Sequence, residues 1–337
     1  MRIWYDACTG KHVRYGAAIA EHLRKLGHEV VFTTREHPDT LSVAKLLGEK
    51  PVVVGKYNPA SLLARVEESA ERILQFSKLF KDKLPDFAIS SPSIELCRFA
   101  FGLNIPSILT ADTPHAEAAN RLSIPLAKTL VTSEAIPKKL FEAYGAQKIV
   151  QFKGVDEVAW IKGSKPSATY DYGRPLIVVR QIETRAAYAC GKDDNTIKLA
   201  EKLSHLGNIL FLPRYSKPEN KKIKVADNFV DSASLAGQAD LVVSAGGTIS
   251  REAALQGTPS IVISDFGQIE VNRYLHTKGF PIFTVNASQV EAYAKRYLCK
   301  RFEVKKKLEQ LESPLKVISK LIFAGSQDFR QLPRESS

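Results

Sequence analysis

The stretch "CTGKHVRYGAAIAEHLRKLGHEVVF", residues 8–32, decides the fold class of this chain. It follows a short apolar run at residues 2–5, which predicts a strand. Residues 13–26 carry apolar side chains at helical spacing and predict a helix that Gly27 caps at its C-terminus. The next strand is expected at residues 29–34. A strand, a helix and a second strand joined by short loops are typical of a parallel sheet covered by helices.

The same alternation continues through the first half of the chain. Strands are expected at residues 86–90, 105–110 and 129–132, and helices at residues 59–84, 93–102, 116–127 and 137–145. The run has the length of one doubly wound domain, which we place at residues 1–153.

A second alternating series follows a connector at residues 154–174, which is rich in Gly, Pro, Ser and Tyr. Its strands are expected at residues 175–180, 208–214, 240–244, 260–264 and 281–285, and its helices at residues 193–205, 232–239, 249–256, 269–278 and 288–311. We therefore predict a second doubly wound domain at residues 175–324 and a polar tail at residues 325–337. The fold class is α/β, with two Rossmann-like domains in tandem.

Composition limits the partners and the compartment. The 337 residues carry a net charge of +12, which favours anionic partners such as nucleotides, phosphate groups or anionic lipid. No compact nucleic-acid module is visible, so we expect no nucleic-acid partner. The basic residues gather at residues 295–307, where a peripheral contact with an anionic membrane is an alternative to a solvated helix face. No apolar run reaches the roughly 20 residues that span a bilayer. The four cysteines form no C-x-x-C pair, and together with the absence of a signal-peptide pattern they predict a cytoplasmic protein without a disulfide framework or zinc site.

The strongest functional signal is "SAGGTISREAALQGTP", residues 244–259. Ligands of open α/β sheets bind outside the carboxyl ends of the strands, and this stretch runs from a strand into a helix. Its glycines let a ligand approach the backbone, and the helix N-terminus offers N–H groups to a phosphate. The residues expected at this site are Gly246, Gly247, Thr248, Ser250 and Glu252. The alternative is an ordinary strand–helix turn with capping side chains.

Polar residues also follow other predicted strands. After the first strand lie Thr9, Gly10, Lys11 and His12; after the strand at residues 105–110 lie Asp112, His115, Glu117, Asn120 and Arg121; in the second series lie Arg180, Thr184 and Arg214. Imidazole and carboxylate groups are the usual acids and bases of enzymes, and arginines suit phosphate groups. The alternatives are a helix cap at His12 and a surface ion pair between Glu117 and Arg121.

The glycine-rich stretch at residues 244–259 resembles the nucleotide-sugar signature of GT-B glycosyltransferases. The lipid-linked N-acetylglucosaminyltransferase of peptidoglycan synthesis has a similar Thr-x-Ser-Glu…Gly-x-Pro stretch, in which the glutamate holds the ribose of UDP. Here Arg251 is one extra residue before the matching Glu252. The same transferase has a Gly-rich loop ending in Gly-His-Val after its first strand, which resembles residues 9–13, with Lys11 in place of a glycine. The UDP-N-acetylglucosamine 2-epimerases carry a related glycine–helix stretch.

The chain as a whole is most similar to the domain-of-unknown-function family 354, a mostly archaeal family of GT-B-like proteins. The shared landmarks are "DACTGKHV", "DTPHAEAANRL", "EAIPKKL", "GVDEVAWI", "VVRQIETRAAYACG" and "SAGGTISREAALQGTPSI". One departure is the loop after Asp6, where the family usually has proline before its histidine and this chain reads Thr-Gly-Lys-His.

The resemblance implies a GT-B-like fold, two Rossmann-like domains facing a cleft, and a glycosyltransferase that takes a sugar from a nucleotide, UDP above all. Glu252 would bind ribose, and His12, or Asp112 with His115 and Glu117 beside them, would position or deprotonate the acceptor. The acceptor is unknown and includes lipid-linked candidates. GT-B enzymes commonly need no metal held by paired aspartates, and no Asp-x-Asp motif occurs, so neither a metal nor a cofactor is expected.

Two alternatives stay open. A UDP-sugar 2-epimerase is weakened because no histidine lies between Arg180 and Asp194, where the epimerases carry one. The other alternative is a non-catalytic protein that binds a nucleotide sugar or nucleic acid.

Overall fold

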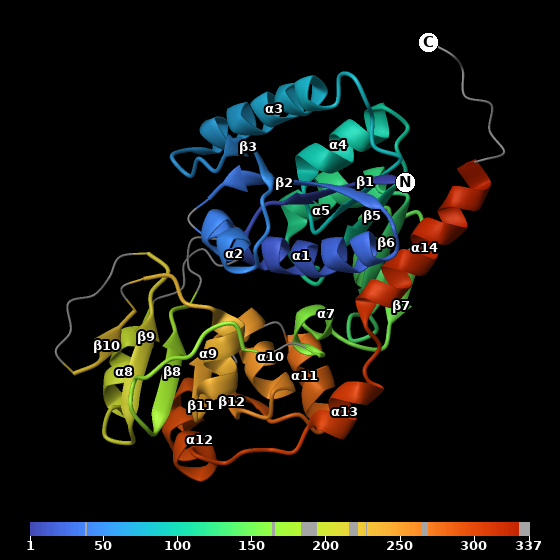
Figure 1. Cartoon of the computed structure of the whole chain (residues 1–337). Coiled ribbons are helices and arrows are strands. Elements are labelled where there is room, and N and C mark those ends of the chain that lie inside the picture. The colour runs from blue at the N-terminus through green and yellow to red at the C-terminus, as the bar shows by residue number, and fades with distance from the viewer. Residues whose placement is uncertain are drawn as a thin grey trace. The chain divides into compact units, whose positions relative to one another are not determined.

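The structure is a computed structural model of the chain. It describes residues 1–37, 39–163, 166–182, 194–215, 222–226, 228–263 and 269–329, without the side chains of residues 269 and 325–329. The chain divides into two compact units (Figure 1). Unit 1 comprises Met1–Ala159 and Glu312–Ser337, and unit 2 comprises Trp160–Leu311.

Unit 1 is built on a parallel sheet of seven strands in the order β3-β2-β1-β4-β5-β6-β7. The strands are β1 (Arg2–Ala7), β2 (Glu29–Glu36), β3 (Val52–Lys56), β4 (Phe87–Ser90), β5 (Ser107–Thr110), β6 (Thr129–Ser133) and β7 (Ile149–Phe152). The helices are α1 (Gly10–Lys25), α2 (Thr40–Leu46), α3 (Leu62–Leu79), α4 (Ile94–Gly102), α5 (Glu117–Ser123), η1 (Ile124–Leu126), α6 (Lys139–Glu142) and α14 (Pro314–Phe329). The strand order reverses between β1 and β4, which is where ligands of such sheets bind.

Close packing of α1 on the sheet positions the loop that precedes it. A Cβ added at Gly16 would lie 2.1 Å from Tyr5 Cε1 on β1, so only glycine permits this approach. On the other face of the sheet Trp4 packs edge-on against Phe76, Phe80 and Phe99. Such aromatic contacts add to the apolar burial that holds the helices on the sheet.

Unit 2 repeats the plan with six parallel strands in the order β10-β9-β8-β11-β12-β13. The strands are β8 (Leu176–Arg180), β9 (Asn208–Leu212), β10 (Lys224–Val225), β11 (Leu241–Ser244), β12 (Ser260–Ile263) and β13 (Ile282–Val285). The helices are α8 (Thr196–Leu203), α9 (Ser232–Gln238), α10 (Thr248–Leu255), α11 (Ile269–Thr277), η3 (Ala287–Gln289), α12 (Val290–Tyr297) and α13 (Lys305–Gln310); α7 (Val158–Ile161) spans the boundary between the units.

Both faces of the second sheet are covered. Ile177 and Val179 on β8 belong to one apolar cluster, whereas Val178 on the same strand belongs to another. Alternate residues of a strand point to opposite faces, so the continuous apolar run of β8 serves two cores. The two tandem doubly wound sheets confirm the predicted fold class.

Several elements escaped the sequence analysis. Helix α2 and strands β3, β7 and β10 were not predicted, and each is short. The helix expected at residues 288–311 is wrong as a continuous element. Leu298 ends α12 in an extended conformation, and Cys299 follows with φ of 62°. Phe302 N then donates to Gly257 O, which pins the irregular segment.

The expected domain boundary at residue 324 also differs from the structure, because residues 312–337 belong to unit 1. Helix α14 packs on α1, with Ile318 and Ile322 buried and Ser319 Oγ 3.3 Å from His22 Nε2. The tail expected to start at residue 325 is helical as far as Phe329. Burial of the apolar face of α14 explains its return to unit 1.

Within the described ranges, no helix is both long enough and apolar enough to cross a membrane.

Candidate functional site

The loop between β1 and α1 is held in place by its own residues. Thr9 caps α1, because its Oγ1 accepts from His12 N at 3.4 Å. On the sheet side of the loop, the hydroxyl of Tyr5 on β1 donates a hydrogen bond to His12 O at 2.9 Å. The predicted loop residues Thr9, Gly10, Lys11 and His12 therefore form the start of α1, at the carboxyl end of a central strand.

Lys11 gathers two carboxylates in unit 1. Its Nζ lies 2.5 Å from Asp112 Oδ2 and 2.9 Å from Asp156 Oδ2. Asp112 follows β5 and Asp156 follows β7, so three strand ends converge on one ammonium group. Burial and the neighbouring Asp112 carboxylate raise the pKa of Asp156 to about 6, while Lys11 opposes the shift. Asp156 is buried, whereas Asp112 is half-buried, so burial favours the protonated form of Asp156 in particular.

Asp156 was missed in the sequence analysis. Residues 154–156, "GVD", follow the end of β7 after one residue, but the sequence analysis predicts no strand there and places them in a connector. With β7 predicted, the rule that ligands bind beyond strand ends would have marked Asp156 as a candidate.

His12 is neutral at physiological pH. Burial and the charge of Lys11 lower its pKa to about 3. Its Nδ1 is buried and has no hydrogen-bond partner among the described residues. An imidazole with so low a pKa is a weak base, so it suits hydrogen bonding better than proton abstraction.

The predicted site residues that follow β5 do not all lie in the same environment. Asn120 is buried, and its Nδ2 donates to Thr113 O at 3.0 Å and Pro114 O at 3.1 Å, which holds the turn after Asp112. Glu117 and Arg121 form an i,i+4 ion pair of 2.9 Å, with exposed fractions of 67% and 65%. His115 is exposed. The surface ion pair weighed above is thus present, and Asn120 serves the loop.

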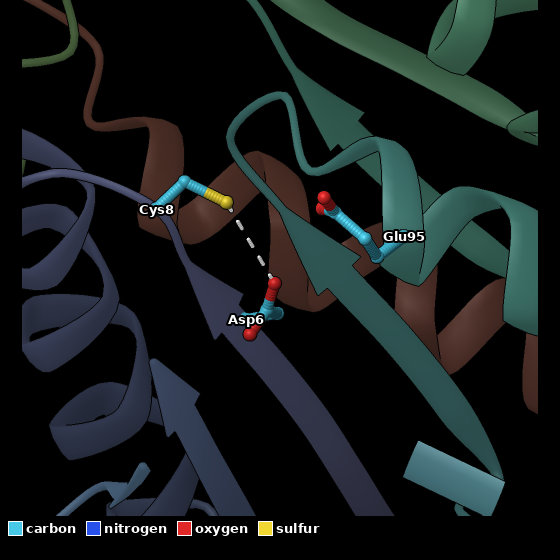
Figure 2. A group of neighbouring side chains, drawn as sticks. All are labelled: Asp6, Cys8 and Glu95. Atoms are coloured by element: carbon cyan, nitrogen blue, oxygen red, sulfur yellow. Dashed lines mark hydrogen bonds between the residues drawn. The ribbon is translucent and has the colours of Figure 1, made fainter. Parts of the chain in front are cut away.

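A buried ionic network lies beneath this loop (Figure 2). Figure 2 shows Asp6 and Cys8 at the end of β1 beside Glu95 of α4, three potential metal ligands in the described chain. The guanidinium of Arg72 already lies among them, with Nη2 2.9 Å from Asp6 Oδ1 and Nη1 2.9 Å from Glu95 Oε2. Ser93 Oγ also donates to Asp6 Oδ2 at 2.6 Å. Because the Arg72 guanidinium already pairs with both carboxylates, the cluster fits a structural ion-pair network better than a metal site.

In unit 2 the predicted glycine turn joins β11 to α10. Gly246 has φ of 87°, a conformation that favours glycine, and its N–H donates to Ser244 Oγ at 3.0 Å. Ser244 Oγ also hydrogen bonds with Ser250 Oγ of α10. Gly247 begins the helix without a side-chain cap, and a Cβ added there would meet no atom within 4 Å. A helix N-terminus of this kind suits an anionic group.

Glu252 lies behind this turn and is buried. Its Oε1 accepts from Trp160 Nε1 at 2.9 Å, so the indole orients the carboxylate. Trp160 was not predicted as a site residue. Trp160 belongs to the landmark "GVDEVAWI" within the predicted connector. A large aromatic residue with a polar N–H group in such a segment was the signal that could have marked it.

The arginines of unit 2 stand at the ends of β8 and β9. Arg180 Nη1 donates to Pro213 O at 3.0 Å, and Arg214 Nε donates to Gln181 O at 2.9 Å. These bonds tie the two strand ends together. Thr184 lies outside the described residues.

Two doubly wound parallel sheets in tandem give the chain a GT-B-like fold, and comparison with solved structures supports this assignment. The UDP-GlcNAc 2-epimerase from Methanocaldococcus jannaschii, in complex with UDP-GlcNAc and UDP, has a similar structure, with a TM-score of 0.67 and 16% identity over 96% of this chain and 100% of that one. The spinosyn forosaminyltransferase SpnP has a TM-score of 0.62 and 13% identity, covering 96% of this chain and 99% of that one. At these identities the likeness shows the fold alone.

Sequence comparison then gives the family. The chain belongs to the family described as protein of unknown function DUF354, whose model matches residues 1–326. The uncharacterized protein MJ0665 from Methanocaldococcus jannaschii is 29% identical over 319 residues, 90% of this chain and 93% of the relative. The UDP-N-acetylglucosamine–N-acetylmuramyl-(pentapeptide) pyrophosphoryl-undecaprenol N-acetylglucosamine transferase from Thermus thermophilus is 27% identical over 280 residues, 75% of this chain and 77% of the relative.

Proposed function

We propose that this protein is a GT-B-type glycosyltransferase that takes a sugar from a UDP-sugar and passes it to a hydroxyl group of an unidentified acceptor. The observation that carries the proposal is the turn at Gly246 and Gly247, which opens α10 with the buried Glu252 behind it. The sequence similarity to a transferase that uses UDP-N-acetylglucosamine supports the same reading.

Unit 2 would bind the donor. The diphosphate would rest on the first amides of α10, where backbone N–H groups and the helix dipole favour negative charge. Glu252 would accept hydrogen bonds from the ribose hydroxyls, held in its orientation by Trp160. Arg180 and Arg214 would offset the charge that develops on the leaving diphosphate.

Unit 1 would supply the base. The neutral, weakly basic imidazole of His12 fits a hydrogen-bonding role toward the acceptor or the sugar. Asp156, paired with Lys11 and Asp112, fits the base better, because a pKa near 6 combines an ionised carboxylate at neutral pH with useful basicity. His115 and Glu117 remain candidates only as exposed groups near the same loop.

With Asp156 as the base and UDP as the leaving group, every bond and proton of the transfer would be accounted for. The acceptor hydroxyl gives its proton to the Asp156 carboxylate, and its oxygen bonds to the anomeric carbon of the sugar. The bond between that carbon and the diphosphate oxygen breaks, and UDP leaves with the electron pair. Neither a metal nor a cofactor enters this scheme.

Ligand-dependent thermal unfolding tests the donor site. We expect UDP and UDP-sugars to raise the unfolding midpoint of the wild type, as a ligand that binds only the folded state must. Glu252→Gln keeps an acceptor for Trp160 but removes the charge, so it should reduce the shift, whereas the exposed Glu303→Gln should not. A wild-type protein that no nucleoside diphosphate stabilises contradicts the proposal.

Product analysis separates the rival activities. Incubation with UDP-sugars and candidate acceptors, polyprenyl-linked ones included, should release UDP only when an acceptor is present. Conversion of the UDP-sugar to its 2-epimer without an acceptor would identify an epimerase instead. Binding without any turnover would identify a nucleotide-sugar binding protein.

A contact with anionic lipid through the basic residues 295–307 is a further part of the proposal, and it would suit a lipid-linked acceptor. Several of these side chains are already engaged within unit 2. Lys295 pairs with Glu291 at 2.7 Å, Arg301 donates to Gly237 O at 2.7 Å, and Lys307 donates to Gly279 O at 2.7 Å. We therefore expect weak, salt-sensitive recovery with anionic vesicles in a flotation assay; recovery unaffected by salt contradicts it.

A further inference from the structure

Arg35 is a half-buried cation near the carboxyl end of β2, beside the candidate loop of unit 1. Its Nε donates to Cys8 O at 3.0 Å, one residue before the Thr9 cap of α1. Its guanidinium lies over the Tyr57 ring, with Cζ 4.9 Å from the ring centroid. Among the residues that the structure describes, neither its Nη1 nor its Nη2 has a hydrogen-bond partner or a carboxylate within ion-pair distance. These contacts orient the guanidinium and leave its two terminal amino groups for a ligand.

His37 supplies a further N–H group against the same aromatic ring. It is half-buried, and its ring centroid lies 5.1 Å from that of Tyr57. His37 Nδ1 accepts from Asp39 N at 3.3 Å, so the neutral imidazole carries its proton on Nε2. Burial and the charge of Arg35 lower the pKa of His37, so this neutral form prevails at neutral pH.

The two side chains lie near the candidate loop of unit 1. Besides burial and Lys11, the charge of Arg35 contributes to the low pKa of His12, which places the guanidinium within electrostatic reach of that imidazole. The start of α2 also packs against the loop, because a Cβ added at Gly10 would lie 3.0 Å from Asp39 Cβ. The carboxylate of Asp39 is exposed, so water and salt screen its repulsion of an anion.

We propose that Arg35 and His37 form a phosphate-binding site, which takes the phosphate group of a phosphorylated acceptor. The guanidinium edge matches two terminal oxygens of a phosphate ester, and the Nε2–H of His37 provides a donor for another. A carboxylate has fewer oxygens for these donors. Because Tyr57 packs against both side chains, binding costs little side-chain entropy. The assignment to the acceptor rests on the proposed transferase activity, whereas the phosphate site itself does not.

Phosphorus NMR of ligands titrated with the full chain, at constant ionic strength, tests the site. The probes are inorganic phosphate and glycerol phosphate, and we expect saturable binding of both by the wild type. Arg35→Met should weaken this binding about tenfold or more, because charge-assisted hydrogen bonds are lost. Arg35→Lys keeps the charge without the planar fork and should give an intermediate affinity. Arg65→Met removes an exposed charge from α3 and should leave the affinity unchanged.

A second variant keeps the test open if Arg35→Met fails to fold. His37→Leu removes one neutral donor and should weaken phosphate binding roughly three- to tenfold, the effect of one hydrogen bond. A wild type without saturable phosphate binding would overturn the proposal. So would equal affinities in the wild type, Arg35→Lys and His37→Leu, or an equal loss in Arg65→Met, which would show attraction by net charge alone.

Competition identifies the source of the phosphate. Inorganic phosphate should inhibit transfer competitively against a phosphorylated acceptor, and Arg35→Met should raise the KM for that acceptor about tenfold while the KM for the donor stays unchanged. Phosphate that binds at Arg35 without competing would mark a site for free phosphate and overturn the assignment to the acceptor.

UDP separates this site from the donor site. Arg35→Met should keep the rise in unfolding midpoint that UDP gives the wild type, and loss of that rise would mean that Arg35 contacts the donor, against the proposal. A wild type that UDP does not stabilise contradicts the transferase activity, and the phosphate titration then still decides whether Arg35 and His37 bind phosphate.

Discussion

At the scale of single residues, Lys11 determines the electrostatics of the loop after β1. Its ammonium group faces two carboxylates from different strands, and it also lowers the pKa of the adjacent His12. Lys11 thus opposes the upward shift of the Asp156 pKa and adds to the burial that lowers the pKa of His12. The resemblance to the transferases had marked Lys11 only as a replacement for glycine.

The substitution Lys11→Met tests this role. Without the ammonium group the pKa of Asp156 should rise further, because burial and Asp112 are no longer opposed. The acidic limb of the turnover–pH profile should move to higher pH, since the base must be ionised to act. Lys25→Met, at an exposed ion pair with Glu21, serves as the matched control and should leave the profile unchanged. An unshifted limb in Lys11→Met would show that Asp156 is not the base.

His12 should make folding pH-dependent in a defined direction. Its pKa is about 3 in the folded protein and near 6.5 in the unfolded chain, so the unfolded chain takes up a proton first as the pH falls. The stabilisation is complete above pH 6.5 and is lost progressively toward pH 3. We expect His12→Gln to show a shallower loss of unfolding free energy across this range, measured by urea titration at several pH values. Equal slopes for the two proteins would place His12 in contact with water.

The carboxylate of Glu252 should matter for donor affinity rather than for chemistry. Glu252→Ala is expected to weaken nucleotide binding by about 1–3 kcal/mol, the scale of a lost charged hydrogen bond. The effect should appear mainly in the KM for the donor, and calorimetry with UDP measures it directly. Trp160→Phe, which removes the Nε1 donor only, should give a smaller loss of the same kind. Normal affinity in both variants would mean that α10 binds no ribose.

At the scale of elements, the Arg72 network joins helices and strands that the sequence places far apart. Arg72 on α3 reaches Asp6 on β1 and Glu95 on α4, and its Nε donates to Val54 O on β3 at 2.8 Å. Its stem lies against Gly55, where an added Cβ would be 2.4 Å from Arg72 Cγ. The network therefore ties α3 to the sheet beneath the candidate loop.

Arg72→Met should destabilise unit 1 strongly. It leaves the buried carboxylates of Asp6 and Glu95 without their cation, and breaking a buried ion pair on one side costs about 3–5 kcal/mol. Denaturant titration measures the loss. Arg65→Met, at an exposed position of the same helix, should stay close to the wild type. Addition of Zn²⁺ or Mg²⁺ should leave the wild-type unfolding midpoint unchanged if Arg72 is the native partner of these carboxylates.

At the scale of the whole molecule, the chain leaves unit 1 before Trp160 and re-enters it at Glu312. The last helix thus stabilises the first unit rather than the second. Glu312 N donates to Lys153 O at 2.8 Å, and Glu312 Oε2 accepts from Lys153 N at 2.9 Å, so the chain is pinned where it re-enters.

Deletion of residues 312–337 should weaken unit 1 selectively. Burial of Ile318 and Ile322 contributes roughly 1.5–3 kcal/mol for each side chain, and the deletion exposes the surface of α1 that they cover. Limited proteolysis with mass spectrometry should show faster cleavage within residues 1–159 and unchanged rates within residues 160–311. Equal protection of the first unit in both proteins would mean that α14 adds no stability to it.

The sequence alone determined the alternation of strands and helices, and with it the fold class, and it indicated the candidate site at residues 244–259. These features depend on local patterns: apolar runs, helical spacing and glycines at turns. The central strands were predicted because each is a buried, continuous apolar run. The missed strands β3, β7 and β10 are edge strands and are only partly buried, so they lack that signature. Helix α14 was missed as well, although it has 16 residues.

Only the tertiary structure decided which distant residues act together. Asp156 joins Lys11 and Asp112 because β7 and β5 end at the same edge of the sheet as β1, and no local pattern contains that register. Trp160 reaches Glu252, and α14 returns to α1, for the same reason: contacts between residues far apart in sequence arise from packing. The proposal of Asp156 rather than His12 as the base also depends on the fold, since burial and neighbouring charge set a pKa, and both exist only in the folded chain.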